Sequence, residues 1–296
     1  MIENTVYLNL CAFYGDRKCV ESLDTHLSDV AIISKYIAGT LYGALGTEFE
    51  KLALVTGLLH DIGKGLTLYQ EEMTSFGGHE LISALIAYKL LLNRCINLCR
   101  EDLVPIVYAI LVHHQRQKPL PTRISSLSRR LMKIKRLHRG KELFPDPLTK
   151  LIHRLFTKYK IPILDTGFNC IERTLKEVEQ DLLESISIWS RRFSSRYEPS
   201  IDIITELFGE YNSILEELSG TNYFKYLVLI HRSRILSGVL MVADKYVSVV
   251  CREKRNEHEE GKDKTLKNPY YLSVERLVKR LWREGKLECM LRKPGH

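Results

Sequence analysis

The spacing of apolar and polar residues predicts helices along most of the chain. From about Leu23 to Leu45, apolar residues recur every three or four positions, and Val30, Ile33, Ile37 and Leu41 form one stripe. This is the period of an amphipathic helix. The same spacing predicts further helices at about 48–59, from 79 onward, and at about 102–114, 125–139, 171–193, 201–218, 224–251 and 274–291.

A different pattern precedes the first helix. Residues 6–13 are rich in β-branched and aromatic residues, Gly15-Asp16 is a turn signal, and residues 18–21 can return as a second short strand. Ser22 and Asp24 are candidate N-caps of the helix that follows. The predicted fold is therefore all-α, a helical bundle with a small N-terminal β-hairpin.

No internal repeat or clear linker divides the chain. We expect one domain over residues 1–254, with a basic helical insertion at about 116–141 and helices of unassigned role at about 145–225. Residues 255–296 are expected to form a charged loop and a basic C-terminal helix packed on the same domain. A chain of 296 residues is long enough to bury a large core.

Composition indicates an ordinary globular protein, with 45% apolar and 27% charged residues. No segment approaches the roughly 20 apolar residues that span a bilayer, and the first residues lack a signal-peptide pattern. We therefore expect a cytoplasmic location. The seven cysteines contain no CxxC pair, which favours free thiols over a disulfide framework or a zinc site.

Positive charge is concentrated in one segment. The net charge is +8, and residues 116–141 contain ten basic and no acidic residues, so the rest of the chain carries 8 − 10 = −2. Such a block is typical of a polyanion-binding surface, although a solvated helix face or a docking surface for an acidic protein would have the same composition. The residues expected to contact nucleic acid are Arg129, Arg130, Lys133, Lys135, Arg136 and Arg139.

Candidate chemistry centres on His60-Asp61, where the apolar run of the second helix ends in Gly63-Lys64-Gly65. Five histidines and two aspartates share one property, because each lies at a helix end or on a stripe that otherwise predicts core. They are His26, His60, Asp61, His79, His113, His114 and Asp244. Burying so many ionisable groups without a metal would be costly, so we predict a metal centre.

Seven nitrogen and oxygen ligands exceed the needs of one ion and suffice for two ions that share Asp61. An imidazole-rich set favours manganese, iron, cobalt, nickel or zinc over magnesium. The absence of thiolates argues against a purely structural zinc site. Two such ions suit hydrolysis of a phosphate ester, with Asp61 and Lys64 in catalytic roles. Lys64 has an alternative as a solvated lysine near a helix C-terminus.

The residues also resemble a known family, the HD phosphohydrolase superfamily, and within it the stand-alone HD nuclease of type I CRISPR-Cas systems. The matching segments are Ala12-Phe13-Tyr14-Gly15, Glu21-Ser22-Leu23 with His26, Gly57 to Lys64, His79 with Ser83-Ala84, Ile110 with His113-His114, and Ala243-Asp244 with Ser248. HD alone is a weak motif, but this ordered series is specific.

This resemblance implies an all-helical HD fold with two metals. His26, His60, Asp61 and Asp244 would hold one ion; Asp61, His79, His113 and His114 would hold the other. The implied activity is cleavage of single-stranded DNA in antiviral CRISPR interference, with R-loop or RNA strands as alternative substrates. The protein would act with a separate helicase and an RNA-guided surveillance complex, and no GxxxxGK[ST] helicase motif occurs in this chain.

Two other functions remain open at this point. An HD hydrolase acting on a small nucleotide would share the metal site but has no use for a block of ten positive charges. A non-catalytic subunit is disfavoured by the complete ligand set. Tyr14, Tyr69 and Phe76 lie near the motifs and could stack nucleobases or serve as packing.

Overall fold

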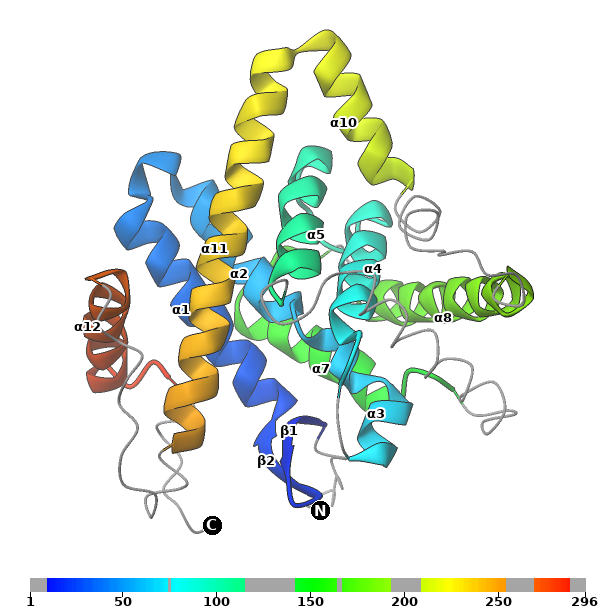
Figure 1. Cartoon of the computed structure of the whole chain (residues 1–296), viewed down its shortest axis with the longest axis horizontal. Helices are drawn as coiled ribbons and strands as arrows, with labels where there is room; N and C mark the ends of the chain where they lie inside the picture. Colours follow the sequence, from blue (N-terminus) through cyan, green and yellow to red (C-terminus); the bar gives the residue numbers. More distant parts are fainter. Residues whose placement is uncertain are drawn as a thin grey trace.

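The chain folds into a helical bundle with a small β-hairpin at its N-terminal end (Figure 1). The structure is a computed structural model that describes residues 10–73, 76–114, 142–163, 167–192, 209–253 and 269–287. The all-α prediction with an N-terminal hairpin is confirmed. The assignment of the chain to one domain stays a prediction.

The hairpin leads directly into the first helix. Strands β1 (Cys11–Gly15) and β2 (Lys18–Ser22) pair antiparallel, and the two turn residues between them, Asp16 and Arg17, have φ angles of 49° and 62°. Ser22 is the N-cap of the helix, because its hydroxyl accepts a hydrogen bond from the Thr25 amide at 3.3 Å. The cap fixes where the hairpin ends and where the helix begins.

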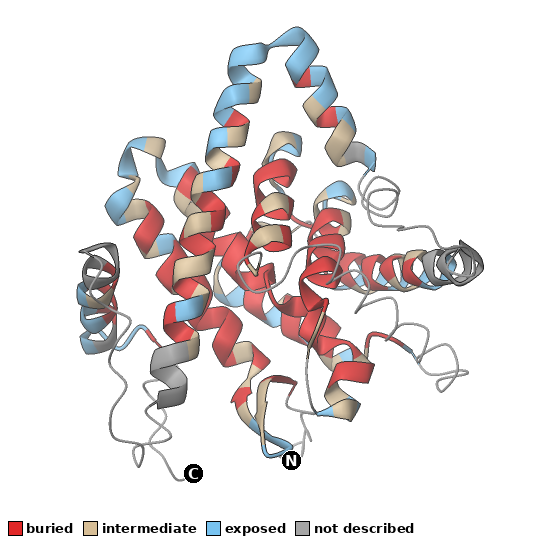
Figure 2. Ribbon diagram, viewed as in Figure 1, coloured by how far each residue is buried: buried red, intermediate tan, exposed pale blue. Residues whose placement is uncertain are grey.

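Five helices build the central core. They are α1 (Leu23–Leu41), α2 (Thr47–Leu59), α4 (His79–Leu92), α5 (Leu103–Val112) and α11 (Tyr223–Glu253). Helix α1 packs on α2, α11 packs on α5 and α1, and α4 packs on α5. Buried residues are concentrated where these helices meet (Figure 2).

Helix α1 is shorter than its apolar pattern predicts. It ends at Leu41, and a separate 3₁₀ turn, η1 (Gly43–Leu45), follows. Gly46 after this turn has a φ of 82°, a conformation that glycine adopts without strain. Periodicity alone could not find this stop, because Leu45 still continues the apolar spacing.

Close helix packing depends on one glycine in α2. A Cβ atom at Gly57 would lie 2.5 Å from the Cα atom of Ala31 in α1. The missing side chain therefore allows the two backbones to approach closely, directly before α2 reaches His60.

Shorter and outer elements surround this core. Helix α3 (Thr67–Glu72) occupies a segment predicted to be a loop, because six residues are too few to show a helical period. Helices α7 (Asp146–Lys158) and α8 (Gly167–Arg192) pack together, and α8 also contacts α4. Helix α10 (Gly209–Thr221) forms a hairpin with α11 that projects from the bundle at the top of Figure 1. The predicted helix at 125–139 lies outside the described residues.

The C-terminal helix α12 (Pro269–Arg283) packs on α1. Its inner face is formed by buried Val274, Leu277, Val278 and Leu281. After the helix, the ammonium group of Lys286 donates to the hydroxyl of Tyr36 in α1 at 2.7 Å. These contacts hold α12 against the rest of the molecule.

One described helix is long and apolar enough to cross a membrane. The segment is Tyr223–Ser248 of α11, so the expectation that no segment approaches this length was wrong. A single such helix is weak evidence, because core helices meet the same criterion. This one packs against α1 and α5, and it carries Asp244 toward the histidine cluster described below.

Four cysteines form disulfides, so the prediction of free thiols was wrong for them. Cys11 is bonded to Cys19 across the β-hairpin, and Cys95 is bonded to Cys170, with Cα–Cα distances of 5.6 and 5.7 Å. Cys99 is free and exposed. Cys95 and Cys170 are 75 residues apart, and sequence spacing gives no means of pairing residues over such a distance.

Candidate metal centre

The end of α2 places His60 and Asp61 in the interior. The helix stops at Leu59, His60 is its C-cap, and the 3₁₀ turn η2 (Ile62–Gly65) follows Asp61. Both side chains are fully buried. The apolar helix α2 thus places two ionisable residues in the core at its C-terminal end, and the 3₁₀ turn follows directly.

Gly63 lets this turn lie against the start of α4. A Cβ atom at Gly63 would be 2.5 Å from the carbonyl oxygen of His79 and 2.8 Å from the amide nitrogen of Ser83. The Gly63 amide also donates to the Ser83 hydroxyl at 2.9 Å. The close approach brings the first residue of α4, His79, beside Asp61.

The remaining candidate ligands arrive from three other elements. His26 lies in the first turns of α1, His113 and His114 follow the end of α5, and Asp244 projects from α11. The structure brings all seven candidates together in two groups. One group is His26, His60, Asp61 and Asp244, and the other is Asp61, His79, His113 and His114. Within each group the ligand atoms lie within 4.8 Å of one another.

Asp61 belongs to both groups, and its two oxygens face different partners. Oδ2 lies 3.1 Å from Nε2 of His26 and 3.4 Å from Nε2 of His60. Oδ1 lies 2.8 Å from Nε2 of His79 and 3.5 Å from Nε2 of His113. This division is the arrangement that a carboxylate bridging two ions requires.

Backbone hydrogen bonds fix the orientation of three of the rings. In each, Nδ1 donates to the carbonyl oxygen three residues earlier in the chain. The pairs are His60 with Gly57 at 2.8 Å, His79 with Phe76 at 2.5 Å, and His113 with Ile110 at 2.6 Å. A carbonyl can only accept, so Nδ1 carries the proton, and in the neutral ring Nε2 presents a lone pair to the site.

These lone pairs face the carboxylate of Asp61, which is itself an acceptor. In the described structure, Oδ1 of Asp61 and Nε2 of His60, His79 and His113 are buried without a hydrogen-bond partner. Acceptors opposed at 2.8 to 3.5 Å repel each other unless positive charge lies between them. The donor set therefore fits divalent metal ions, which would be held by the two groups of ligands.

Two further residues support the ligands from outside. Oε1 of Glu21, at the end of β2, lies 3.1 Å from Nδ1 of His26, and the Ser248 hydroxyl donates to Oδ1 of Asp244 at 3.3 Å. A carboxylate behind a ligand histidine orients the ring and increases its basicity. Glu21 was missed as a functional residue, although its position five residues before His26, where strand meets helix, was the available signal.

Lys64 is bound to the shared aspartate. Its ammonium group donates to Oδ2 of Asp61 and lies 5.3 Å from the ring centroid of Phe76. The lysine is only 7% exposed, so the alternative of a solvated C-terminal lysine does not describe it. Its catalytic role stays a prediction.

Electrostatics in the cluster keep the carboxylates charged. Burial by itself would raise the pKa of Asp61, but the neighbouring His60 ring and the Lys64 ammonium group outweigh it and hold that pKa well below its usual range. The pKa of Asp244 is also held well below its usual range, because its interactions with the neighbouring His26 and His60 rings outweigh burial.

The direction of the pKa shift differs among the histidines of the cluster, depending on what surrounds each ring. Burial would lower the pKa of His26, but Glu21 and the two aspartates raise it well above its ordinary value. Asp61 likewise raises the pKa of His113 despite burial. Burial lowers the pKa of His60, and burial together with His113 and His79 lowers that of His114 to about 2.

The centre reaches solvent along one edge. The side chains of Lys64, His79 and Asp244 are 9%, 8% and 13% exposed, whereas those of His26, His60, Asp61 and His113 are inaccessible. His114 is also partly exposed, so within the described residues solvent reaches the cluster beside these side chains. The basic residues predicted to contact nucleic acid, Arg129, Arg130, Lys133, Lys135, Arg136 and Arg139, lie outside the described residues.

Comparison with protein families identifies the segment that carries this centre. Residues 23–140 match the HD domain. The match supports the HD phosphohydrolase superfamily, and an HD domain indicates a metal-dependent hydrolase. Six of the seven candidate ligands lie in the matched segment, and Asp244 joins them from α11 in the fold. Comparisons with curated proteins and with solved structures found no match.

Proposed function

We propose that this HD domain is a metal-dependent nuclease that cleaves single-stranded DNA. It would act in CRISPR interference, together with a separate helicase subunit and an RNA-guided surveillance complex. One observation supports phosphodiester hydrolysis as the reaction. The two carboxylate oxygens of Asp61 face different groups of ligands, as a carboxylate shared by two ions would. The resemblance of the ordered motif series carries the assignment to nucleic acid and to its partners.

We propose that the site takes two divalent ions. His26, His60 and Asp244 would hold one, His79, His113 and His114 would hold the other, and Asp61 would bind both. Five imidazoles favour manganese, nickel, cobalt or iron over magnesium, which prefers oxygen ligands. When bound, such ions supply the acidity that activates water and the charge that stabilises phosphoryl oxygens.

The chain's own residues would orient the reaction. Lys64, at the exposed edge, would shift part of its hydrogen bonding from Asp61 to a non-bridging oxygen of the scissile phosphate. Glu21 and the backbone carbonyls behind the histidines hold the rings so that Nε2 points inward. Complete burial of Asp61 excludes bulk water from the shared ligand and strengthens these interactions.

The basic block at 116–141 supports a strand rather than a small nucleotide as substrate. It follows His114 directly in sequence and carries ten positive charges. A single strand with several phosphates would use such a surface, whereas a mononucleotide would use one or two of its charges.

The test is cleavage of single-stranded DNA, duplex DNA and a panel of nucleotides with Mn²⁺, Ni²⁺, Co²⁺ and Mg²⁺ in turn. We expect cleavage of the single strand with a transition metal and loss of cleavage in Asp61→Ala with an unchanged circular dichroism spectrum. Asp24→Asn is the matched control, because Asp24 is two residues from His26 but pairs with Arg154 at 2.9 Å away from the site.

The outcomes separate the parts of the proposal. Hydrolysis confined to nucleotides would replace the substrate while keeping the metal centre. Retained cleavage in Asp61→Ala would remove the bridging role of Asp61. Equal cleavage of single strands and duplexes would contradict the need for a separate helicase.

A further inference from the structure

Two aromatic rings lie at the exposed edge of the metal centre. Tyr14 of β1 and Phe76 before α4 stack with centroids 5.6 Å apart and an interplanar angle of 17°. The centroid of Phe76 is 5.3 Å from the ammonium group of Lys64, which is bound to the shared ligand Asp61. Both rings are partly exposed, so this stack, here called the aromatic pair, borders the space that a substrate phosphate must enter.

The aromatic pair is held rigidly to the metal ligands. The Tyr14 hydroxyl donates to Oε1 of Gln70 at 2.8 Å, and Nε2 of Gln70 donates to the carbonyl of Lys64 at 2.6 Å. The carbonyl of Phe76 accepts from Nδ1 of His79 at 2.5 Å. The Tyr14 hydroxyl and the Phe76 backbone are therefore each connected to a residue of the candidate metal centre.

Tyr69 differs from these two rings. It is fully buried, its ring meets the edge of Phe76 at 5.7 Å, and its hydroxyl donates to the carbonyl of Gly77 at 2.7 Å. Tyr69 therefore supports Phe76 as packing, and it has no face available to a ligand. Of these three aromatic residues, Tyr14 and Phe76 are the partly exposed ones, and the Lys64 ammonium group lies over the Phe76 ring.

We propose that the aromatic pair binds the nucleobase next to the scissile phosphate by stacking. This inference rests on the proposed function, because it requires a substrate that carries a nucleobase. It also gives a physical reason why single strands would be preferred to duplexes. A base can stack on a protein ring only when it has left its own helical stack, so a paired duplex cannot use the pair.

The test compares two fluorescent oligomers of equal length, one of thymidine units and one of abasic units. Their binding to the metal-loaded protein is measured by anisotropy, and cleavage is measured in parallel. We expect the intact protein to bind the thymidine oligomer about 5- to 150-fold more tightly, the range measured for base–aromatic stacking. Tyr14→Leu and Phe76→Leu should bring the ratio of the two affinities close to one, mainly by weakening the binding of the thymidine oligomer.

Conservative variants separate stacking from structure. Tyr14→Phe and Phe76→Tyr keep the rings and should keep the preference for the base. Equal losses on both oligomers in the leucine variants, or no preference in the intact protein, would overturn the proposal. Binding does not require cleavage, so a protein that prefers the base but cuts no strand would contradict the nuclease function and not the aromatic pair.

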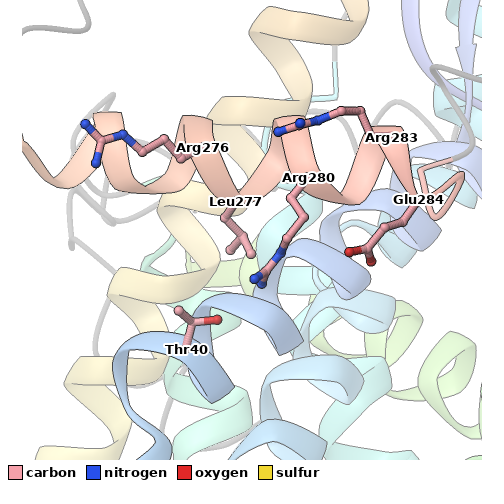
Figure 3. A pocket seen from close by; sticks show the side chains of 6 residues that line it. All are labelled: Thr40, Arg276, Leu277, Arg280, Arg283 and Glu284. Carbon is pink, nitrogen blue, oxygen red and sulfur yellow. The ribbon is translucent and has the colours of Figure 1, made fainter.

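A second, independent observation concerns the groove between α1 and α12, which has a volume of about 600 Å³. It is lined by Thr40, Arg276, Leu277, Arg280, Arg283 and Glu284 (Figure 3). The side chain of Arg280 points across the groove toward Thr40 in Figure 3. The groove is separate from the metal centre, because Thr40 is fourteen residues along α1 from His26, or about 21 Å.

The three arginines carry the positive charge of the groove. Nε of Arg283 donates to the carbonyl of Lys279 at 3.2 Å, and Arg280 and Arg283 contribute, after Lys286, to lowering the pKa of Glu284 in the same groove. Among the described residues, no carboxylate lies within ion-pair distance of Arg276, Arg280 or Arg283, whereas Lys279 pairs with Glu275 at 2.5 Å. Spacings of four and three residues put the arginines on one face of α12, over about 10.5 Å of its axis. An extended row of guanidinium groups outside ion pairs matches a row of phosphates better than one small anion.

We infer that this groove binds the phosphate backbone of a single-stranded nucleic acid several nucleotides from the cut. The test measures how the affinity for a thymidine 20-mer depends on salt concentration, with a chelator present to keep the protein free of metal. Replacing all three arginines with glutamine should reduce the slope of log K against log salt by about 2, since each phosphate contact on a single strand contributes about 0.7.

Lys279→Gln is the matched control, because the lysine is exposed on the same helix but already paired. It should change the slope by less than about 0.7. An unchanged slope in the triple variant would overturn the inference and leave the groove to an acidic protein. The readout needs neither metal nor cleavage, so it is independent of the proposed activity.

Discussion

Glu21 illustrates how a residue outside the ligand set can control the metal centre. It is buried, and its carboxylate lies behind Nδ1 of His26, while Nε2 of the same ring faces Asp61 and Asp244 at 3.1 and 3.4 Å. The negative charge of Glu21 favours a polarised ring with electron density on Nε2. Metal affinity should therefore depend on Glu21 although it binds no ion.

Glu21→Gln keeps the shape and the hydrogen-bond acceptor but removes the charge. We expect metal affinity to fall about 10- to 100-fold, as measured by competition with a chelator, with activity restored at high metal concentration. Glu48→Gln is the control, because Glu48 is exposed and 3.9 Å from Lys51. An unchanged affinity in Glu21→Gln would reduce the contact to packing.

Protons and metal compete for His26 and His113. In the metal-free protein, burial acts to lower the pKa of both histidines, but nearby carboxylates outweigh it and raise both values. Glu21 is the main cause for His26, and Asp61 is the main cause for His113. Ligand rings must release a proton to bind an ion through Nε2. Raising the pH through and above about 6.5, the ordinary histidine value, removes the competing proton and should increase metal affinity, by up to about tenfold per unit for each proton displaced.

This pH dependence can be measured by metal titration at several pH values between 6.5 and 8.5. His60 and His114, with lowered pKa values, should contribute nothing in this range because they are already neutral. The aspartates, with lowered pKa values, remain charged throughout. An affinity that is constant over this range would contradict the raised pKa values of His26 and His113.

At the scale of elements, the centre is assembled from helix ends. His60 and Asp61 follow α2, His79 begins α4, and His113 and His114 follow α5. Side chains at helix ends can converge on one point, and Asp244 from within α11 completes the group. The contact between η2 and α4 at Gly63 sets the spacing of this assembly.

Gly63→Ala should disturb both packing and metal binding. Its Cβ atom would meet the carbonyl oxygen of His79 at 2.5 Å, and backbone cannot rotate away as a side chain can. We expect the free energy of unfolding to fall by about 1–3 kcal/mol and metal affinity to fall with it. Gly238→Ala in α11, where no atom lies within 4 Å, should instead leave stability unchanged or raise it by up to about 1 kcal/mol. Urea denaturation of both variants provides the comparison, and equal effects would contradict the steric argument.

Local patterns predicted the elements and the candidate ligands because both are encoded within a few residues. Helical period placed His26 and His79 on buried faces, and the abrupt end of an apolar run marked His60-Asp61. The structure then brought all seven candidates together. The Cys95–Cys170 bond was missed because it joins segments that are distant in sequence. The support of His26 by Glu21 was missed although the two residues are only five positions apart, because the contact depends on how the strand turns into the helix.

At the scale of the molecule, the ligands come from residues 26 to 244, so the centre exists only when the bundle is assembled. Metal binding should therefore stabilise the fold as a whole. The outer helix α8 is joined to this bundle by the Cys95–Cys170 disulfide near the end of α4, and by an ion pair of 2.6 Å between Lys89 and Asp181. These links lie far from the ligand cluster, since His79 and Leu92 are at opposite ends of α4, about 20 Å apart.

Loss of the Cys95–Cys170 disulfide should therefore destabilise the protein without emptying the metal centre. Closing a loop of 75 residues restricts the unfolded chain, and such bonds contribute about 2–4 kcal/mol. We expect Cys170→Ala to lower Tm, with metal content measured by mass spectrometry unaltered. Reduction of the unchanged protein should lower Tm at least as much, because it also opens the Cys11–Cys19 bond of the hairpin. Cys99→Ala is the control, because Cys99 is exposed and free. A Tm unaffected by reductant, together with alkylation of Cys95 in the unreduced, denatured protein, would contradict the disulfide and restore the prediction of free thiols.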